Sequence, residues 1–145
     1  MVALGNFLFR FRNYLFPLAL VLVFVPGPRL ISSLGAAALG LGAVVRGQAI
    51  RICTIGIEYI IRGGRQRRVY AEKLVTDGLY AHSRNPMYVG NLLMVSGVCI
   101  TSNSWGCVAT AIPLFTIAYL AITRAEEEFL MRTFGGAYAR YCADV

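Results

Sequence analysis

Residues 86–123 read PMYVGNLLMVSGVCITSNSWGCVATAIPLFTIAYLAIT and contain no acidic or basic side chain. Two apolar runs, residues 86–101 and 105–123, flank a short polar turn at residues 102–104. A connection this short joins two antiparallel helices. Because a membrane-spanning helix needs about 20 mostly apolar residues, this stretch predicts a helical hairpin that enters a membrane.

Two further apolar runs precede the hairpin. The first covers residues 14–25 and stops at Pro26-Gly27-Pro28, because a pair of prolines cannot continue a helix. The second begins near Leu30 and becomes more amphipathic after Val45, toward Ile61. The pattern predicts an all-α protein, a polytopic transmembrane helical bundle of about four spans, with residues 1–145 as a single domain.

The composition excludes an ordinary soluble protein. Hydrophobic residues make up 57% of the chain and charged residues 14%, against roughly 45–50% and about 25% in globular proteins. The mean hydropathy is +0.62. The four cysteines form no C-x-x-C pair and have no histidine at ligand spacing, so we expect no metal site.

The charge distribution predicts an orientation. A net charge of +7 would suggest nucleic acid in a soluble protein, but between long apolar runs it indicates the anionic cytoplasmic leaflet instead. With both termini in the cytoplasm, thirteen of the fourteen basic residues lie on the cytoplasmic side, and Arg29 is the exception. We therefore predict an integral membrane protein with cytoplasmic N and C termini and no nucleic-acid partner.

Two predicted cytoplasmic segments, residues 62–85 and 124–145, hold the polar residues that could do chemistry. They contain all the acidic residues except Glu58, and also the only histidine, His82. The basic cluster at residues 62–68 suits anionic lipid head groups. Contact with an anionic substrate or cofactor is the alternative.

Four polar side chains gather where the third helix enters the hydrocarbon: Tyr80, Arg84, Asn85 and Tyr88. Such groups are costly there unless they are paired or functional. Pro86 suits the first turn of this helix, and Asn85 suits its N-cap. Because a cation at a helix N-terminus is unfavourable, we expect a bound carboxylate beside Arg84, which would also satisfy the free N–H groups of the helix.

The chain after the fourth apolar run, which we expect to end at Thr123, has the spacing of an amphipathic helix on the membrane surface. Glu128 and Arg132 form an i, i+4 pair in it. Glu126 and Glu127 precede that pair, and three consecutive carboxylates repel one another. We therefore expect a positive group near them: Arg84, the basic cluster or a cationic ligand.

Small residues in the second apolar run have the spacing of closely packed membrane helices: Ala36 with Gly40, and Ala38 with Gly42. We expect both pairs to pack inside the bundle. Contact between two copies of the chain is the alternative.

The two polar blocks and their order resemble the integral membrane methyltransferases, the superfamily of isoprenylcysteine carboxyl methyltransferase and phospholipid N-methyltransferases. The family pattern is L-V-x-x-G-x-Y-x-x-x-R-H-P-x-Y-x-G, a helical hairpin, and then E-E-x-x-L-x-x-x-F-G-x-x-Y-x-x-Y. The resemblance covers residues 66–141. The first block matches at Leu74, Val75, Gly78, Tyr80, Arg84, Pro86, Tyr88 and Gly90. The second block matches at Glu126, Glu127, Leu130, Phe134, Gly135, Tyr138 and Tyr141.

The resemblance implies an enzyme that transfers a methyl group from S-adenosylmethionine to a lipid or small lipophilic acceptor at the cytoplasmic membrane face. The cofactor would lie between the cytoplasmic loop and the C-terminal amphipathic helix. The implied cofactor-binding residues are Gln66, Leu74, Val75, Tyr80, Asn85, Pro86, Met87, Tyr88, Glu126 and Glu127. Arg84 and Tyr88 are the implied catalytic residues.

Two positions depart from the family pattern. Asn85 replaces a histidine and cannot titrate, so we expect no acid–base chemistry from it. Ile122 stands where the carboxyl methyltransferases have an arginine for the substrate carboxylate, which argues against a prenylcysteine acceptor. An amine acceptor would have to lose a proton, and His82 is the only histidine that could take it.

Two other functions stay open on the sequence. The chain could be a small four-span transporter with Glu58 as its intramembrane carboxylate. It could also be an NADPH-dependent enzyme similar to the sterol reductases, which share a related membrane core. Against the latter, Gly40 and Gly42 lie in an apolar helix and do not form a dinucleotide-binding loop after a strand.

Overall fold

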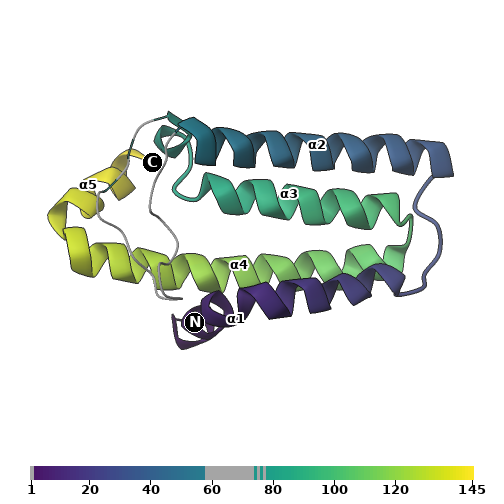
Figure 1. Cartoon of the computed structure of the whole chain (residues 1–145), viewed down its shortest axis with the longest axis horizontal. Helices are drawn as coiled ribbons and strands as arrows, with labels where there is room; N and C mark the ends of the chain where they lie inside the picture. Colours follow the sequence, from purple (N-terminus) through teal and green to yellow (C-terminus); the bar gives the residue numbers. More distant parts are fainter. Residues whose placement is uncertain (1, 58–73, 75, 77) are drawn as a thin grey trace.

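The protein is a bundle of helices. The computed structural model describes residues 2–57, 74, 76 and 78–145, and the part described contains no strand. The elements are α1 (Val2–Ala19), η1 (Leu20–Phe24), α2 (Ser33–Ile57), η3 (Gly78–Ala81), α3 (Pro86–Thr101), α4 (Trp105–Phe134) and α5 (Gly136–Asp144). Helices α1 to α4 run along the long axis of the molecule, and α5 lies at one end (Figure 1). The all-α prediction is confirmed.

Within the described part of the chain, three helical stretches are long and apolar enough to cross a membrane: Val2–Phe24, Ser33–Ile55 and Trp105–Phe134. Helix α3 is apolar too, but its 16 residues rise only about 24 Å, less than the roughly 30 Å of hydrocarbon. The outer surface carries large apolar side chains such as Phe24 and Leu34, which are 84% and 82% exposed. Such a surface suits contact with lipid. The number of four membrane spans remains a prediction.

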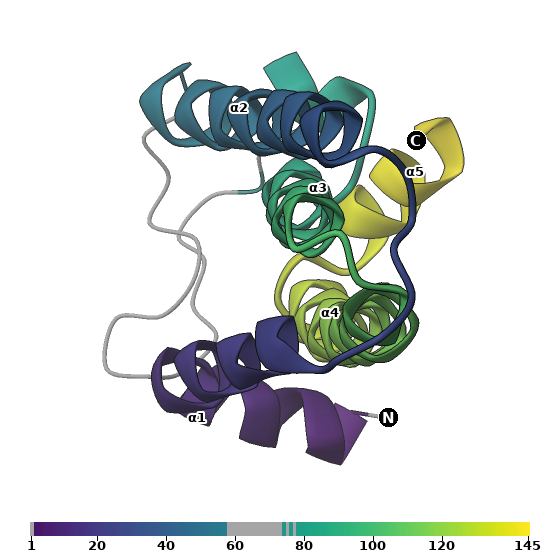
Figure 2. The same cartoon turned by 90° about the vertical axis from the view of Figure 1, so that its right-hand side faces the viewer.

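Both chain ends lie at the same end of the bundle. The α1–α2 connection and the α3–α4 hairpin lie at the opposite end (Figure 1). Seen end-on, α2 packs on α3, α1 packs on α4, and α3 joins the two pairs by packing on α4 (Figure 2). The position of both chain ends at one end of the bundle agrees with an even number of membrane crossings. Their cytoplasmic location remains a prediction.

The predicted hairpin turn is present, and Asn103 fixes it. Its φ of 52° lies in the left-handed region, which asparagine tolerates better than most residues. The Asn103 side-chain oxygen accepts the backbone N–H groups of Leu30 at 3.0 Å and Ile31 at 3.2 Å. Its amide nitrogen donates to the Ile31 carbonyl at 2.9 Å. One side chain thus joins the hairpin to the chain segment that leads into α2.

Glycines let α2 and α3 approach closely. The helices run antiparallel, with Gly40 against Gly97 and Gly47 against Gly90. A Cβ atom at Gly97 would lie 2.6 Å from the Gly40 carbonyl oxygen, and one at Gly47 would lie 2.6 Å from the Gly90 carbonyl oxygen. Close approach of this kind supplies packing energy between membrane helices. The prediction that Gly40 packs inside the bundle is confirmed, as it is for the fully buried Ala36.

The same prediction is wrong for the second small pair. Ala38 is exposed, and a Cβ atom at Gly42 would meet nothing within 4 Å. Because successive helical residues are rotated by about 100°, position 42 lies on a different face from Gly40 and Gly47.

Helix α4 is longer than the apolar run that begins it. We expected the fourth span to end at about Thr123, before a separate amphipathic helix. The helix instead continues without a break to Phe134, and Gly135, with a φ of 51°, ends it before α5. Residues 124–134 contain no glycine or proline, and the predicted Glu128–Arg132 pair is present. The acidic segment is therefore a continuous extension of α4.

Replacing Gly97 with alanine is expected to lower the free energy of unfolding by about 1–3 kcal/mol, because the new Cβ atom would push α2 and α3 apart. The matched variant Gly42→Ala should be neutral or raise it by up to about 1 kcal/mol, since alanine is the better helix former. Unfolding in detergent, followed by circular dichroism, measures both. Equal stability of the two variants would contradict the glycine-mediated packing.

Candidate active site

The site begins at the N-terminus of α3. Pro86 occupies the first turn, as predicted, and Asn85 occupies the N-cap position. The Asn85 backbone carbonyl accepts the N–H groups of Tyr88 at 3.1 Å and Val89 at 3.2 Å. Its side chain forms no capping hydrogen bond, so the predicted role of that side chain as a cap is wrong. The Asn85 side-chain amide therefore does not cap the N-terminus of α3.

Tyr88 connects α3 to α4. Its hydroxyl donates a hydrogen bond of 2.6 Å to Oε1 of Glu126. The Tyr88 ring is buried and stacks on Tyr119, with 5.3 Å between ring centroids and 28° between ring planes. A hydrogen bond to a carboxylate is stronger than one between neutral groups, so this contact fixes both side chains. It also brings together the two sequence blocks that flank the hairpin.

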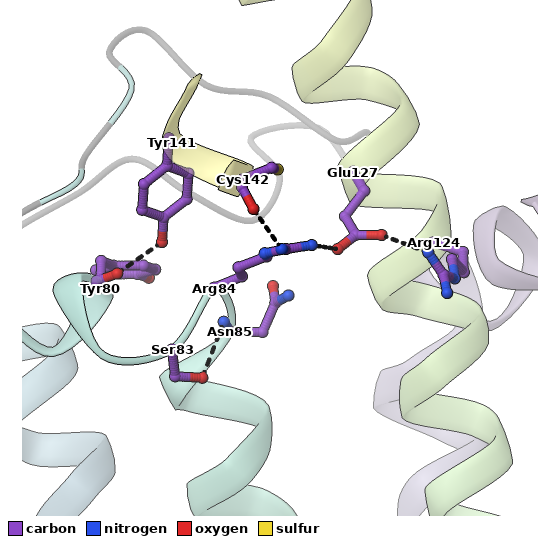
Figure 3. Close-up of polar contacts among 8 residues, drawn as sticks. All are labelled: Tyr80, Ser83, Arg84, Asn85, Arg124, Glu127, Tyr141 and Cys142. Carbon is purple, nitrogen blue, oxygen red and sulfur yellow. Dashed lines mark hydrogen bonds and ion pairs between the residues drawn. The ribbon is translucent and has the colours of Figure 1, made fainter. Parts of the chain in front are cut away.

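Arg84 connects the start of α3 to both C-terminal helices (Figure 3). Its Nη2 donates to the Cys142 carbonyl at 2.6 Å, and its Nη1 lies 3.7 Å from Oε1 of Glu127. The Cys142 carbonyl belongs to the last turn of α5, the end of a helix that favours a cation. Glu127 also pairs with Arg124 at 3.1 Å. The anion expected beside Arg84 is therefore a carboxylate of the protein itself.

Tyrosines fasten η3 against α5. The Tyr141 hydroxyl donates to the Tyr80 carbonyl at 2.7 Å, and both residues are buried (Figure 3). Tyr138, Tyr141 and Leu130 form a small buried cluster, and Leu74 packs against it. The segment before α3 is thus held against the C-terminal end of the chain, as the proximity of the two motif blocks requires.

The structure places most of the predicted site residues at this end of the bundle. The three sets of contacts described above involve Tyr80, Arg84, Tyr88, Glu126 and Glu127, and Leu74 packs nearby. Pro86 is buried. Gln66 and Val75 lie outside the described residues. His82 is exposed, and its Nδ1 lies 3.3 Å from the Gly78 carbonyl of its own turn.

Tyr88 also lines a cavity of about 340 Å³ between the helices. All four long helices contribute to its lining, which includes Arg12 of α1, Arg51 of α2, Met87, Tyr88 and Asn91 of α3, and Tyr119 of α4. The Arg51 guanidinium donates a hydrogen bond to the side-chain oxygen of Asn91. This cavity was not predicted from the sequence. The sequence feature that could have indicated it is the presence of Arg51 and Asn91 in otherwise apolar helices, because polar groups there often mark functional sites.

Comparison with known proteins identifies the family. Residues 31–137 match the model of the phospholipid methyltransferase family. The chain belongs to this family. The match includes α2, the hairpin, the first motif block and the second block as far as residue 137, so the resemblance drawn from the motifs is confirmed.

Two known proteins are similar in sequence to this member of the phospholipid methyltransferase family, over different lengths. Protein-S-isoprenylcysteine O-methyltransferase B of Arabidopsis thaliana is 30% identical over 128 residues, which cover 86% of this chain and 63% of that protein. Cobalt-zinc-cadmium resistance protein CzcN of Cupriavidus metallidurans is 38% identical over 61 residues, which cover 42% of this chain and 28% of that protein. The chain thus spans less than two thirds of either relative. No solved structure matches it significantly.

Replacing Arg84 with glutamine should loosen α5, because the Cys142 carbonyl and Glu127 both lose a cationic partner. We expect amide hydrogen exchange in α5 to become about tenfold faster, the effect of losing roughly one charge-assisted hydrogen bond. Arg140→Gln, at an exposed position of α5, is the matched control and should exchange at the wild-type rate. Exchange that is unchanged in Arg84→Gln would show that this residue does not hold α5.

Proposed function

We propose that this protein transfers a methyl group from S-adenosylmethionine to a lipid or small lipophilic acceptor at the cytoplasmic face of the membrane. The observation that carries the proposal is the hydrogen bond between Tyr88 and Glu126. It joins the two motif blocks of a methyltransferase family at the edge of an intramembrane cavity. We propose that the cofactor binds on one side of Tyr88 and the acceptor on the other.

The charges near α5 suit S-adenosylmethionine, which carries a sulfonium, an ammonium and a carboxylate. Glu126 and Glu127 are half-buried carboxylates that suit the two cations. The faces of Tyr80 and Tyr88 suit the sulfonium through cation–π attraction. The Asn85 amide can both donate and accept hydrogen bonds. The remaining members of the proposed cofactor site are Gln66, Leu74, Val75, Pro86 and Met87.

When bound, the cofactor supplies an electrophilic methyl group on sulfur. The task of the protein is then to align the acceptor with that group, because in-line displacement depends mainly on proximity and orientation. Tyr88 suits this task, since its hydroxyl is fixed by Glu126, its ring is fixed by Tyr119, and it lines the cavity. We propose Tyr88 as a catalytic residue on this basis.

Arg84, the other residue that the resemblance implied as catalytic, is proposed to position the site. Its contacts with Cys142 and Glu127 hold α5 and the acidic part of α4 against the start of α3. This closes the cofactor side of Tyr88 and keeps Glu127 in place. A guanidinium there also suits the carboxylate of the cofactor.

We further propose four spans with the N-terminus, the C-terminus and α5 in the cytoplasm. The distribution of basic residues supports this orientation, as does the position of both chain ends at one end of the bundle (Figure 1). The cofactor is a water-soluble cytoplasmic compound, and the proposed cofactor side of Tyr88 lies at that same end.

Glu126→Gln is expected to weaken the binding of S-adenosylhomocysteine and S-adenosylmethionine, the latter by about 10- to 100-fold, the usual effect of losing a charged hydrogen-bond partner. Glutamine can still accept the Tyr88 hydrogen bond, so the change removes the charge and spares the fold. Titration calorimetry of the purified protein in detergent measures both affinities.

Glu128→Gln is the matched control, because Glu128 lies on the same helix and pairs with Arg132. It should bind both compounds as the wild type does. The proposal fails if the wild type binds neither compound, or if Glu126→Gln and Glu128→Gln behave alike.

A further inference from the structure

We infer that Asn91 is a positioning residue, because its hydrogen bond to Tyr119 holds the ring on which Tyr88 stacks. This inference rests on the proposed methyltransferase function, in which Tyr88 aligns the acceptor with the cofactor. It adds the residues that keep Tyr88 in place. The evidence is a set of side-chain contacts that joins α2, α3 and α4.

Two pairs of side chains connect α3 to α4. Tyr88 donates to Glu126, and Asn91 forms a side-chain hydrogen bond with Tyr119. Positions 88 and 91 are three apart on α3, and positions 119 and 126 are seven apart on α4, so each helix uses one face for both contacts. The order of the contacts is reversed between the two helices, as an antiparallel hairpin requires. The two hydrogen bonds thus hold the same two helix faces together.

The chemistry of the partners decides how the Asn91 amide is oriented. The Arg51 guanidinium has only N–H donors, and it donates to the side-chain oxygen of Asn91. The amide nitrogen is then the group that donates to the Tyr119 hydroxyl. Close helix packing brings Arg51 to this place, since a Cβ atom at Gly90 would lie 3.1 Å from the Arg51 Cγ atom. Arg51 therefore holds the amide in the orientation that serves Tyr119.

The Tyr119 ring is the surface against which Tyr88 rests. Tyr119 is 7% exposed, and its ring meets Phe16 of α1 edge-on, with 5.2 Å between the ring centroids. Tyr88 stacks on the Tyr119 ring, while Glu126 holds the Tyr88 hydroxyl. A phenol held only at its hydroxyl can swing about that point, whereas a stacked ring cannot. The position of Tyr88 therefore depends on Tyr119, and through Tyr119 on Asn91.

Alignment is the step of the reaction that these contacts affect. In-line displacement depends on the geometry of the reacting groups, and a misplacement of about 1 Å can lower the rate by about 100-fold. Asn91, Tyr119 and Tyr88 all line the 340 Å³ cavity. A shift of the Tyr119 ring would move Tyr88 with it. We therefore expect loss of the Asn91 contact to lower the turnover rate and to spare the binding of the cofactor.

The test uses the full chain in lipid vesicles and measures the transfer of radiolabelled methyl from S-adenosylmethionine into lipid. The rate is divided by the number of sites that bind S-adenosylhomocysteine in the same preparation. Tyr119→Phe keeps the ring and removes the hydroxyl. We expect it to lower the turnover rate per site by about 10- to 100-fold and to leave the affinity for S-adenosylhomocysteine unchanged. A merely structural role would reduce the number of binding sites and leave the turnover rate of each site unchanged.

A double-variant cycle tests whether Asn91 and Tyr119 act through one hydrogen bond. We expect Asn91→Leu to lower the turnover rate per site at least as much as Tyr119→Phe does. The variant with both changes should be no slower than Asn91→Leu alone. Losses that multiply in the double variant would show independent effects and overturn the inference. Tyr14→Phe removes a hydroxyl at an exposed position of α1, and this matched control should keep the wild-type turnover rate.

Near-ultraviolet circular dichroism of Asn91→Leu gives a readout that does not depend on activity. The variant keeps every tyrosine of the chain, so a weaker tyrosine signal reports looser packing of the rings. We expect a weaker tyrosine signal than in the wild type and an unchanged far-ultraviolet signal from the helices. A near-ultraviolet spectrum identical to that of the wild type would show that Asn91 does not hold Tyr119, and would overturn the inference.

The same samples separate this inference from the proposed function. If the wild type binds S-adenosylhomocysteine and labels lipid, while Tyr119→Phe and Asn91→Leu keep the wild-type turnover rate per site, the positioning role is wrong and the methyltransferase proposal stands. If the wild type does not bind S-adenosylhomocysteine, the proposed function fails, and the positioning role fails with it.

Discussion

A polar group inside an apolar helical bundle must find a partner within the protein or a ligand, and this constraint shapes the molecule from one end to the other. The clearest case is the contact of Tyr88 with Glu126, a 2.6 Å hydrogen bond between α3 and α4. Since Tyr88 is buried and Glu126 is half-buried, either group would be costly without its partner. The bond therefore holds the start of α3 and the acidic part of α4 in one arrangement, around which Arg84, Tyr80 and α5 are organised.

The same constraint explains the two ends of the bundle. At the hairpin end, Asn103 satisfies backbone groups of residues 30 and 31 and so closes the loops against one another. At the end with the chain termini, Arg84 and Tyr141 bind backbone carbonyls of Cys142 and Tyr80. Between these ends, α2 and α3 meet through close glycine contacts and through the hydrogen bond from Arg51 to Asn91.

The sequence predicted the helices well where local signals are strong, and less well where tertiary contacts decide. Pro86 and the short turn around Asn103 defined α3 and the hairpin, because proline and turn residues act locally. The length of α4 was underestimated, because the helix continues to Phe134 past the change from apolar to charged residues at Arg124. Ala38 and Gly42 show that spacing alone does not say which face of a helix is covered.

The candidate site was predicted in part. Spacing and family pattern brought the start of α3 and the acidic residues together, but Arg84 meets Glu127 and Cys142, which no local pattern indicates. The cavity with Arg12 and Arg51 could not be predicted from the sequence, because its lining comes from four helices that are far apart in the chain.

The most direct test of the account is transfer of radiolabelled methyl from S-adenosylmethionine into the lipid extract of vesicles that contain the protein. The account predicts label in lipid for the wild type and Glu128→Gln, and its loss in Tyr88→Phe and Glu126→Gln. Equal labelling by all four proteins, or none by the wild type, would contradict it.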